Sequence, residues 1–534
     1  MRITVLACWV LALLVVGDVV PARGAQSAGS AIVDVGERPE IAAPTVASEA
    51  ALAAVAALGS DLDRAMSVPG WRTDEWSVLV VSLDRGDTLF AREPDAALAP
   101  ASNMKLFTSA AALYYLGPDY RFNTFLVTNG TIRDGVLDGD LIVYGTGDPT
   151  LSTRGRSAWQ AFADTLEVLG IHTVAGAIVG DVSFFQGPGN GTGWRESYVN
   201  ASYAAPANAL TLNDNLVTVV VRPGQRPGEP AVVETVPGGQ GVAIRNSATT
   251  TSGSGAQLRI GRDDYESPIV VAGAIGTGHA GISRVVPVGD GGNFAASVLR
   301  QVLAERGITV MGGVREIREA EASAVSSRTV FAPAFDNGAP VRTLAVHQSP
   351  PLVEILEVVN KQSHNLYAEQ VIRAVGRAVL GEGSAVAGAL ATRYFLECET
   401  GDGDFVLEMV DGSGLSPLNR VSAGTLVRLL AYVAESGIWE AFWSTLPEAG
   451  RSDGLRRMYQ TMAAGNLRAK TGTINEVSAL SGYVNTRDGE RLAFAIVSNQ
   501  VPSTWRAKVV EDQIGARLAG FRRPDYVPVP AVAD

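Results

Sequence analysis

A serine and a lysine three positions apart in the stretch PASNMKLFTSAAALYYLGP are the residues best suited to chemistry. Ser102 and Lys105 share one face if the residues from Asn103 onward form a helix. No Asp, Glu or Arg and no second Lys lies between Asn103 and Pro118. Apolar surroundings lower the pKa of a lysine ammonium, and a neutral amine can take the proton from a serine hydroxyl. The pair therefore predicts a serine nucleophile with a lysine base.

Lysine is scarce in this chain, because only 4 of the 43 basic residues are lysines, at positions 105, 361, 470 and 508. Where arginine supplies most of the positive charge, the remaining lysines mark sites that need a compact ammonium able to lose its proton. A lysine-poor composition that arose at random explains the scarcity but not the positions. We expect Lys361 and Lys508 to be solvated rather than catalytic.

Ser-x-x-Lys alone is weak evidence for a catalytic serine, and two further motifs strengthen it. Ser363, His364 and Asn365 form a Ser-x-Asn motif at the start of a predicted helix, and Lys470 begins a Lys-Thr-Gly motif in a strand-like stretch. In chain order the three motifs match the set found in penicillin-binding proteins and class A β-lactamases. Together they predict acyl transfer to a serine.

The elements that must position these motifs follow from apolar periodicity and turn residues. Residues 76–93 predict a hairpin that turns at 85–87, and the helix carrying the lysine is expected to be capped by Ser102 and ended by Gly117. From about 120 to 320, short apolar strands alternate with glycines, and helical periodicity then returns. A long β-rich stretch therefore separates the first motif from the other two.

Length and composition bound the protein class. The chain has 534 residues, 46% hydrophobic and 18% charged, which is enough for two to four globular domains. The formal charge is −12 without a dense run of Lys or Arg, so no nucleic-acid partner is expected.

Residues 1–24 are typical of a secretory signal peptide, since the apolar run Ile3–Gly17 is shorter than the roughly 20 residues of a spanning helix. A retained N-terminal anchor is the alternative. After cleavage Cys398 would be the single cysteine, so no intramolecular disulfide is expected.

From about residue 47 to 520 the chain resembles the class C low-molecular-mass penicillin-binding proteins, the serine D-alanyl-D-alanine carboxypeptidase/endopeptidase family. The resemblance includes all three motifs. It also includes stretches specific to that family, among them GTGDPTL at 145–151, GDVSFF at 180–185, YAAPANALTLNDN at 203–215, DGSGLSPLNRVS at 411–422 and LSGYV at 480–484.

The resemblance implies an α/β (α+β) serine β-lactamase/DD-peptidase-like transpeptidase fold, an antiparallel sheet flanked by helices, with two inserted β-rich domains. The catalytic penicillin-binding domain would comprise residues 45–122 and 325–522. Domain II would comprise 123–147 and 232–324, and domain III, nested in domain II, would comprise 148–231. The 261 residues between the first two motifs leave room for such insertions.

The resemblance also implies the role of each motif residue. Ser102 would attack the carbonyl between two D-alanines, Lys105 would take its proton, and Ser363 would pass a proton to the leaving amine. Backbone N–H groups of Ser102 and Thr473 would hold the oxyanion. No metal or organic cofactor is expected. The substrate-binding residues would be Asn365, Lys470, Thr471, Gly472 and Thr473.

The expected enzyme is a serine-type D-Ala-D-Ala carboxypeptidase or endopeptidase that is exported to the periplasm or the cell wall. Its partners would be peptidoglycan stem peptides and β-lactam antibiotics, with no stable membrane span after signal cleavage. The balance between trimming terminal D-alanine and cutting cross-links stays open. The alternatives are a serine β-lactamase, which would release the acyl group rapidly, and a catalytically inactive peptidoglycan-binding protein.

Three positions depart from the family pattern. His364 stands where Asn is frequent, whereas Gln186 and Pro417 stand where Asp and Arg are common and put the stem-peptide preference in doubt. Other chemistries fit less well. GRSDG at 450–454 matches a nucleophile elbow, but an α/β-hydrolase needs a histidine after its serine and the last histidine is His364. The four histidines lack metal-binding spacing.

Overall fold

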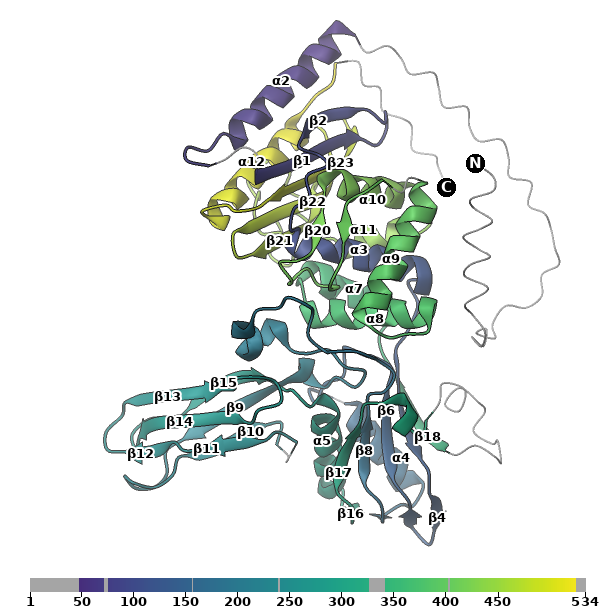
Figure 1. Ribbon diagram of the computed structural model, residues 1–534, viewed down its shortest axis with the longest axis vertical. Coiled ribbons are helices and arrows are strands. Elements are labelled where there is room, and N and C mark those ends of the chain that lie inside the picture. The colour runs from purple at the N-terminus through teal and green to yellow at the C-terminus, as the bar shows by residue number, and fades with distance from the viewer. Residues whose placement is uncertain are drawn as a thin grey trace, which may run out of the picture.

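The fold is that of a computed structural model. It describes residues 48–71, 75–155, 157–238, 241–325, 341–401 and 404–524. The expected signal peptide at 1–24 lies outside this set. Among the described residues, none of the helices is both long and apolar enough to span a bilayer. One large domain and two smaller β-rich bodies are visible in Figure 1.

A five-stranded antiparallel sheet is the centre of the large domain, with strand order β2-β1-β23-β22-β21. Strand β1 pairs with β23 along its whole length, so the two ends of the described chain share one sheet (Figure 1). The predicted N-terminal hairpin is confirmed. The strands are β1 (Trp76–Ser82), β2 (Thr88–Arg92), β21 (Arg468–Ile474), β22 (Val477–Asn485) and β23 (Arg491–Ser498).

Both faces of this sheet are buried. Alternate residues of β23 point to opposite faces, as the two-residue period of a strand requires, with Phe494 in one core and Ala495 in another. Helices α2 (Glu49–Met66) and α12 (Thr504–Gly520) cover the first face. Helix α10 (Ala423–Glu435) covers the second. The sheet is therefore the middle layer of a three-layer sandwich.

Helix α3 (Met104–Leu116) lies at the centre of the helical side, and its residues from 104 to 113 are all buried. Gly117, with a φ of 79°, ends it as predicted. A helix enclosed on all sides explains why its sequence is apolar around its whole circumference. Its neighbours are α7 (Leu352–Lys361), α8 (Asn365–Leu380), α9 (Ala385–Thr400) and α11 (Trp439–Thr445).

A first inserted domain lies between the large domain's α3 and α7. Its five-stranded mixed sheet has the order β17-β8-β6-β3-β18, and α4 (Ala158–Val168) and α5 (Gly291–Glu305) pack against it. A small sheet of order β16-β7-β5-β4 continues it. The strands are β3 (Asn123–Thr128), β4 (Thr131–Arg133), β5 (Val136–Asp138), β6 (Leu141–Gly145), β7 (Thr173–Val174), β8 (Ile178–Asp181), β16 (Thr309–Val310), β17 (Val314–Ile317) and β18 (Arg342–Gln348).

A second domain is nested in the first between β8 and α5. It consists of two small sheets, one of order β10-β9-β15 and one of order β11-β14-β12 with β13 beside β14. Its strands are β9 (Leu216–Arg222), β10 (Val232–Val236), β11 (Ile244–Asn246), β12 (Thr249–Thr251), β13 (Ala256–Gly261), β14 (Ile269–Gly276) and β15 (Ile282–Pro287).

The strand pairings differ from the expected domain boundaries. Residues 148–182 hold α4, β7 and β8, whose partners belong to the first inserted domain, whereas 232–287 hold strands that pair only within the nested domain. Strand β18 pairs with β3, so the first insert extends beyond residue 324. Parallel pairs such as β6 with β8 are joined by long crossovers, and apolar patterning does not indicate which strands they connect. We propose boundaries of 123–182 and 288–348 for the first insert and 216–287 for the nested domain.

Residues 183–215 connect β8 to β9 and lie against the large domain; they are the crossing segment. Most of its regular structure is short 3₁₀ turns: η3 (Glu196–Asn200), η4 (Ser202–Ala204) and η5 (Asn213–Asn215). Helix α8 binds the segment through side chains, since Gln370 Nε2 donates to Asn208 O at 2.8 Å and Arg373 Nη2 donates to Pro188 O at 2.5 Å. The inserts are thereby fixed to the helix that follows the Ser-x-Asn motif.

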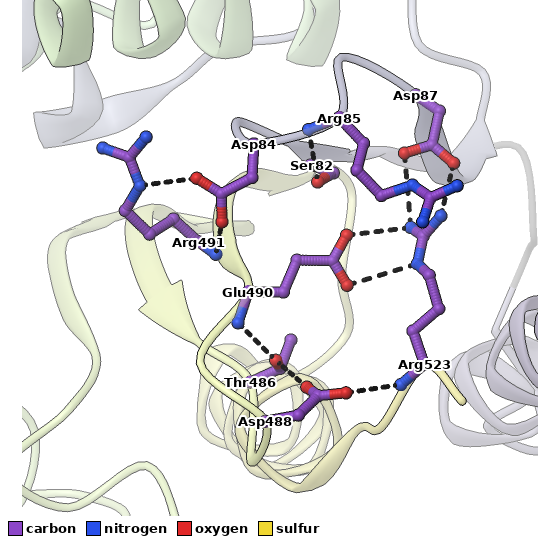
Figure 2. Close-up of polar contacts among 9 residues, drawn as sticks. All are labelled: Ser82, Asp84, Arg85, Asp87, Thr486, Asp488, Glu490, Arg491 and Arg523. Carbon is purple, nitrogen blue, oxygen red and sulfur yellow. Dashed lines mark hydrogen bonds and ion pairs between the residues drawn. The ribbon is translucent and has the colours of Figure 1, made fainter. Parts of the chain in front are cut away.

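An ion-pair network binds the residues after α12 to two turns of the central sheet (Figure 2). The Arg523 side chain is 1% exposed and contacts the fully buried Glu490 at 3.0 Å. It also contacts Asp87, in the β1–β2 turn, at 2.6 Å. The Arg523 N–H donates to Asp488 Oδ2 at 2.8 Å. One guanidinium therefore joins three segments that are distant in sequence.

Replacing Arg523 is expected to destabilise the large domain. Arg523→Met leaves the Glu490 carboxylate buried without its cation, which costs about 3 kcal/mol. The midpoint of thermal unfolding, followed by circular dichroism, should fall, and adding Glu490→Gln should restore part of the loss. The exposed neighbour Arg522 supplies the matched control, Arg522→Met. Equal midpoints for Arg523→Met and Arg522→Met would contradict the assignment.

Candidate active site

The structure brings the three sequence motifs together, although 261 residues separate the first two. Ser102 lies in a 3₁₀ turn, η2 (Ala101–Asn103), and Lys105 lies in the first turn of α3. Ser363 and Asn365 lie where α7 gives way to α8, and Lys470 lies on β21, the edge strand of the central sheet.

Lys105 is fully buried and its ammonium makes three hydrogen bonds. Nζ donates to Ser102 Oγ at 3.0 Å, to Asn365 Oδ1 at 2.7 Å and to the Ser413 carbonyl at 2.6 Å. Burial lowers the pKa of Lys105 to about 7, against the opposing charges of Asp411 and Glu369. When neutral, the amine keeps two N–H donors for Asn365 and Ser413, so its lone pair is directed at Ser102. The arrangement can therefore deprotonate the Ser102 hydroxyl.

Ser102 does not cap helix α3, contrary to the prediction. The N-cap residue is Asn103 without a side-chain capping bond, because the Ser102 hydroxyl is engaged by Lys105 instead. The residue before it, Ala101, has a left-handed φ of 47°. A Cβ at Gly414 would lie 1.8 Å from the Ala101 carbonyl oxygen, so only glycine allows this close approach. The backbone before Ser102 is thus constrained by the left-handed conformation of Ala101 and by the close packing of Gly414 against it.

A second serine–lysine pair lies beside the first. Lys470 is also fully buried, and its Nζ donates to Ser363 Oγ and to Thr471 O, both at 2.9 Å. Burial, and then the charge of Lys105, lowers the pKa of Lys470 well below its ordinary value. Ser363 has a left-handed φ of 57°. The two lysines thus face two serine hydroxyls in one site.

Strand β21 approaches the Ser102 turn closely. A Cβ at Gly472 would lie 2.7 Å from the Pro100 carbonyl oxygen, and Asn103 Nδ2 donates to Lys470 O at 3.2 Å. Thr471 is half-buried and Thr473 is exposed, so both hydroxyls border solvent rather than the core. Strand β21 is the edge strand of the sheet, and among the described residues its outer side pairs only at Arg468, through a single bridge to Glu448. A substrate can therefore extend along this edge.

Two carboxylates that sequence reasoning missed shape the loop above Lys105. Glu369 Oε1 accepts from Ser413 N at 2.9 Å, and burial raises the pKa of Glu369 to about 7. Asp411 accepts from the N–H groups of Gly414 and Ser416, both at 2.7 Å. These bonds aim the Ser413 carbonyl at Lys105. The stretch DGSGLS at 411–416 belongs to the family pattern, but that pattern alone does not indicate a role for Asp411.

The crossing segment contributes Tyr203 and Asp214, which lie in the family stretch at 203–215 but for which the sequence predicts no role. Asn365 Nδ2 donates to the Tyr203 carbonyl at 2.8 Å, which fixes the amide whose oxygen binds Lys105. His364 Nε2 lies 3.6 Å from Asp214 Oδ1, and burial lowers the pKa of His364. The site is therefore built from the large domain and the insert together.

The two other family departures have defined contacts. Gln186 Nε2 donates to Ser183 O at 2.9 Å, and its Oε1 accepts from Gly383 N at 2.7 Å. The Gln186 amide thus joins the start of the crossing segment to the turn before α9. The Pro417 carbonyl accepts from Arg420 Nη1 at 2.6 Å.

The described residues contain no cluster of three or more His, Cys, Asp or Glu side chains that could hold a metal ion. Cys398 forms no disulfide with another described residue.

Known proteins resemble this chain over most of its length. Residues 58–520 match the D-Ala-D-Ala carboxypeptidase 3 (S13) family. The D-alanyl-D-alanine carboxypeptidase of Actinomadura sp. (strain R39) is 34% identical over 494 residues, which cover 90% of this chain and 87% of that protein. A crystal structure of penicillin-binding protein 4 from Haemophilus influenzae superposes with a TM-score of 0.69 at 25% identity, covering 85% of this chain and 97% of that one. A second structure of that protein, with a bound β-lactam, has a TM-score of 0.65 at 24% identity and covers 85% of this chain and 97% of that one.

The low pKa of Lys105 can be measured directly, because the chain has only four lysines. With lysines labelled by ¹³C at Cε, the Lys105 resonance, identified by its loss in Lys105→Arg, should titrate near pH 7. Removing the neighbouring charge with Lys105→Met should raise the pKa of Lys470. A Lys105 resonance that titrates only in the range of free lysine, about 10.4, would contradict the buried-base assignment.

Proposed function

The chain belongs to the D-Ala-D-Ala carboxypeptidase 3 (S13) family, and we propose that this serine-type D-Ala-D-Ala peptidase forms its acyl-enzyme on Ser102. Its fold is that of the serine β-lactamases and DD-peptidases. The observation that carries the proposal is the buried Lys105 ammonium, whose Nζ lies 3.0 Å from Ser102 Oγ. The substrate is the D-Ala-D-Ala end of a peptidoglycan stem peptide, or a related cross-link.

In the first step Ser102 Oγ attacks the substrate carbonyl while neutral Lys105 takes the hydroxyl proton. With a pKa of about 7, a large share of Lys105 is neutral at neutral pH and still basic enough to accept a proton. Asn365 Oδ1 and the Ser413 carbonyl keep the amine oriented throughout. The N–H groups of Ser102 and Thr473 stabilise the oxyanion, each by a few kcal/mol.

In the second step the leaving D-alanine amine must gain a proton. Ser363 Oγ, bonded to Lys470 Nζ at 2.9 Å, is placed to relay it from the lysine pair. The exposed hydroxyl of Thr473, with Thr471 and the Lys470 ammonium, suits the terminal carboxylate of the substrate. Gly472 leaves room for the substrate strand, and Asn365 orients its amide. Water then hydrolyses the acyl group from Ser102.

β-Lactams are proposed as inhibitors of this site, because they carry an acylating carbonyl beside a carboxylate. The solved Haemophilus relative has been captured with a bound β-lactam. A peptidoglycan substrate supports the proposal that the enzyme acts outside the cytoplasm, in the periplasm or at the cell wall. The His364 and Pro417 departures leave both Ser–Lys pairs intact.

Fluorescent benzylpenicillin should label the protein covalently, with the label mapped to the Ser102 peptide. Ser102→Ala should abolish the labelling, whereas Ser109→Ala, another serine of α3, should retain it. A stable adduct with slow nitrocefin turnover supports the peptidase, and rapid turnover without an adduct indicates a β-lactamase instead. Labelling at another serine, or no labelling together with no nitrocefin turnover, would refute the assignment of Ser102.

The acylation rate should rise with pH, because only the neutral form of Lys105 accepts the serine proton. Well below the Lys105 pKa of about 7, the second-order rate constant for benzylpenicillin should change about tenfold per pH unit and level off above it. Lys105→Arg should slow acylation by at least about 100-fold, since a guanidinium does not release its proton. Lys508→Arg, outside the site, is the matched control. A flat pH profile would argue against a lysine base.

A further inference from the structure

A large cavity lies far along the inserts from the serine–lysine site, between the nested domain and α5. Its volume is about 840 Å³, within the range of small-molecule sites. The walls come from the β13–β14 loop, the end of β15 and the outer face of α5. None of the motif residues lines it.

Arg262 lies in the wall of this cavity and is 5% exposed. Its Nη1 donates to the Tyr265 carbonyl at 3.0 Å, while its buried Nε has no hydrogen-bond partner. Within the described part of the chain, no carboxylate lies within ion-pair distance of this guanidinium. The neighbouring Asp264 accepts instead from the N–H and hydroxyl of Ser267. A buried, unpaired cation is costly unless an anion accompanies it.

The position of Arg262 is fixed by the surrounding backbone. Asn200 of the crossing segment accepts from Arg262 N and donates to Arg262 O, both at 2.8 Å. A Cβ at Gly289 would lie 1.8 Å from the Tyr265 carbonyl oxygen. The β13–β14 loop, whose Tyr265 carbonyl binds Nη1, therefore packs directly against the backbone that follows β15. The guanidinium is therefore held in place rather than free to move to solvent.

Helix α5 supplies a second cation to the cavity wall. Arg300 of α5 is half-buried, and its Nη2 lies 3.5 Å from the Val310 carbonyl. Ser297, on the same helix, is 7% exposed and lines the cavity. Two carboxylates also line it, Glu266 and Asp290, and Asp290 is 3.7 Å from Arg318. A ligand here needs an anionic group for the arginines and hydroxyl or amino groups for the remaining polar wall.

We propose that this cavity binds a polar ligand through a carboxylate or phosphate group held by Arg262 and Arg300. Two components of a cell wall carry such groups: the peptide carboxylates of peptidoglycan and the phosphates of polyol-phosphate polymers. The choice of wall components rests on the proposed function, whereas the anion site itself does not depend on the activity of the serine–lysine pairs. It concerns a second site, on the inserts, for an anion-bearing part of the wall.

Binding should be measured by isothermal titration calorimetry on the full chain, before and after acylation by benzylpenicillin, so that binding at the serine site is separated. The probes are N-acetylmuramyl-L-alanyl-D-isoglutamine for a peptide carboxylate, glycerol 3-phosphate for a polyol phosphate, and glycerol as the uncharged control. At least one anionic probe should bind the acylated protein with a Kd below about 1 mM, and glycerol should not. Binding of the muramyl peptide alone, of the phosphate alone, or of both identifies the source of the anion.

Arg262→Met and Arg300→Met should each weaken this binding at least tenfold. Arg284→Met, on the exposed face of β15 and outside the cavity, should leave it unchanged. Circular dichroism verifies folding, and the half-buried Arg300 keeps the test available if Arg262→Met does not fold. The proposal is overturned if neither anionic probe binds the wild-type protein, or if binding survives the Arg300→Met substitution and any folded Arg262 variant.

Discussion

Three hydrogen bonds to one buried ammonium organise the functional part of this protein. Lys105 Nζ binds a hydroxyl of the 3₁₀ turn that precedes its helix, an amide of the Ser-x-Asn motif and a carbonyl of the loop at 411–416. Each acceptor belongs to a different segment, so the lysine defines the distance between them. Because the side chain is fully buried, every one of its donors must be satisfied, and displacing any of the three segments would leave a costly unpaired group.

The surrounding architecture meets this requirement through close backbone approach. Gly414 and Gly472 bring the loop and the edge strand against the turn that carries Ser102, at distances that no side chain would permit. Helix α3 packs against α7, α8, α9 and α11, and the Lys105 side chain is fully buried. Burial of this kind lowers the pKa of an amine to the range where it can exchange protons at neutral pH.

The inserts are part of the site as well as attachments to it. The crossing segment binds Asn365 through the Tyr203 carbonyl and Asp411 through Trp194 Nε1, and α8 binds the segment in return. The same segment bonds to the wall of the remote cavity, since Tyr265 donates its hydroxyl to the Ala204 carbonyl at 2.6 Å. One irregular stretch therefore contacts both the serine–lysine site and the domain that carries the cavity.

The sequence by itself determined the local features: the hairpin at 76–93, the end of α3 at Gly117, the three motifs and the apolar surroundings of Lys105. Each depends on residue types a few positions apart, such as turn glycines, apolar periodicity and motif spacing. Only the tertiary structure decided where the inserts begin and end. It also decided that the Ser102 hydroxyl bonds to Lys105 instead of capping α3, and that Glu369, Asp411 and Tyr203 take part in the site. Those features arise from contacts between residues far apart in the chain, whose positions depend on parallel strand pairing and close packing that no local pattern records.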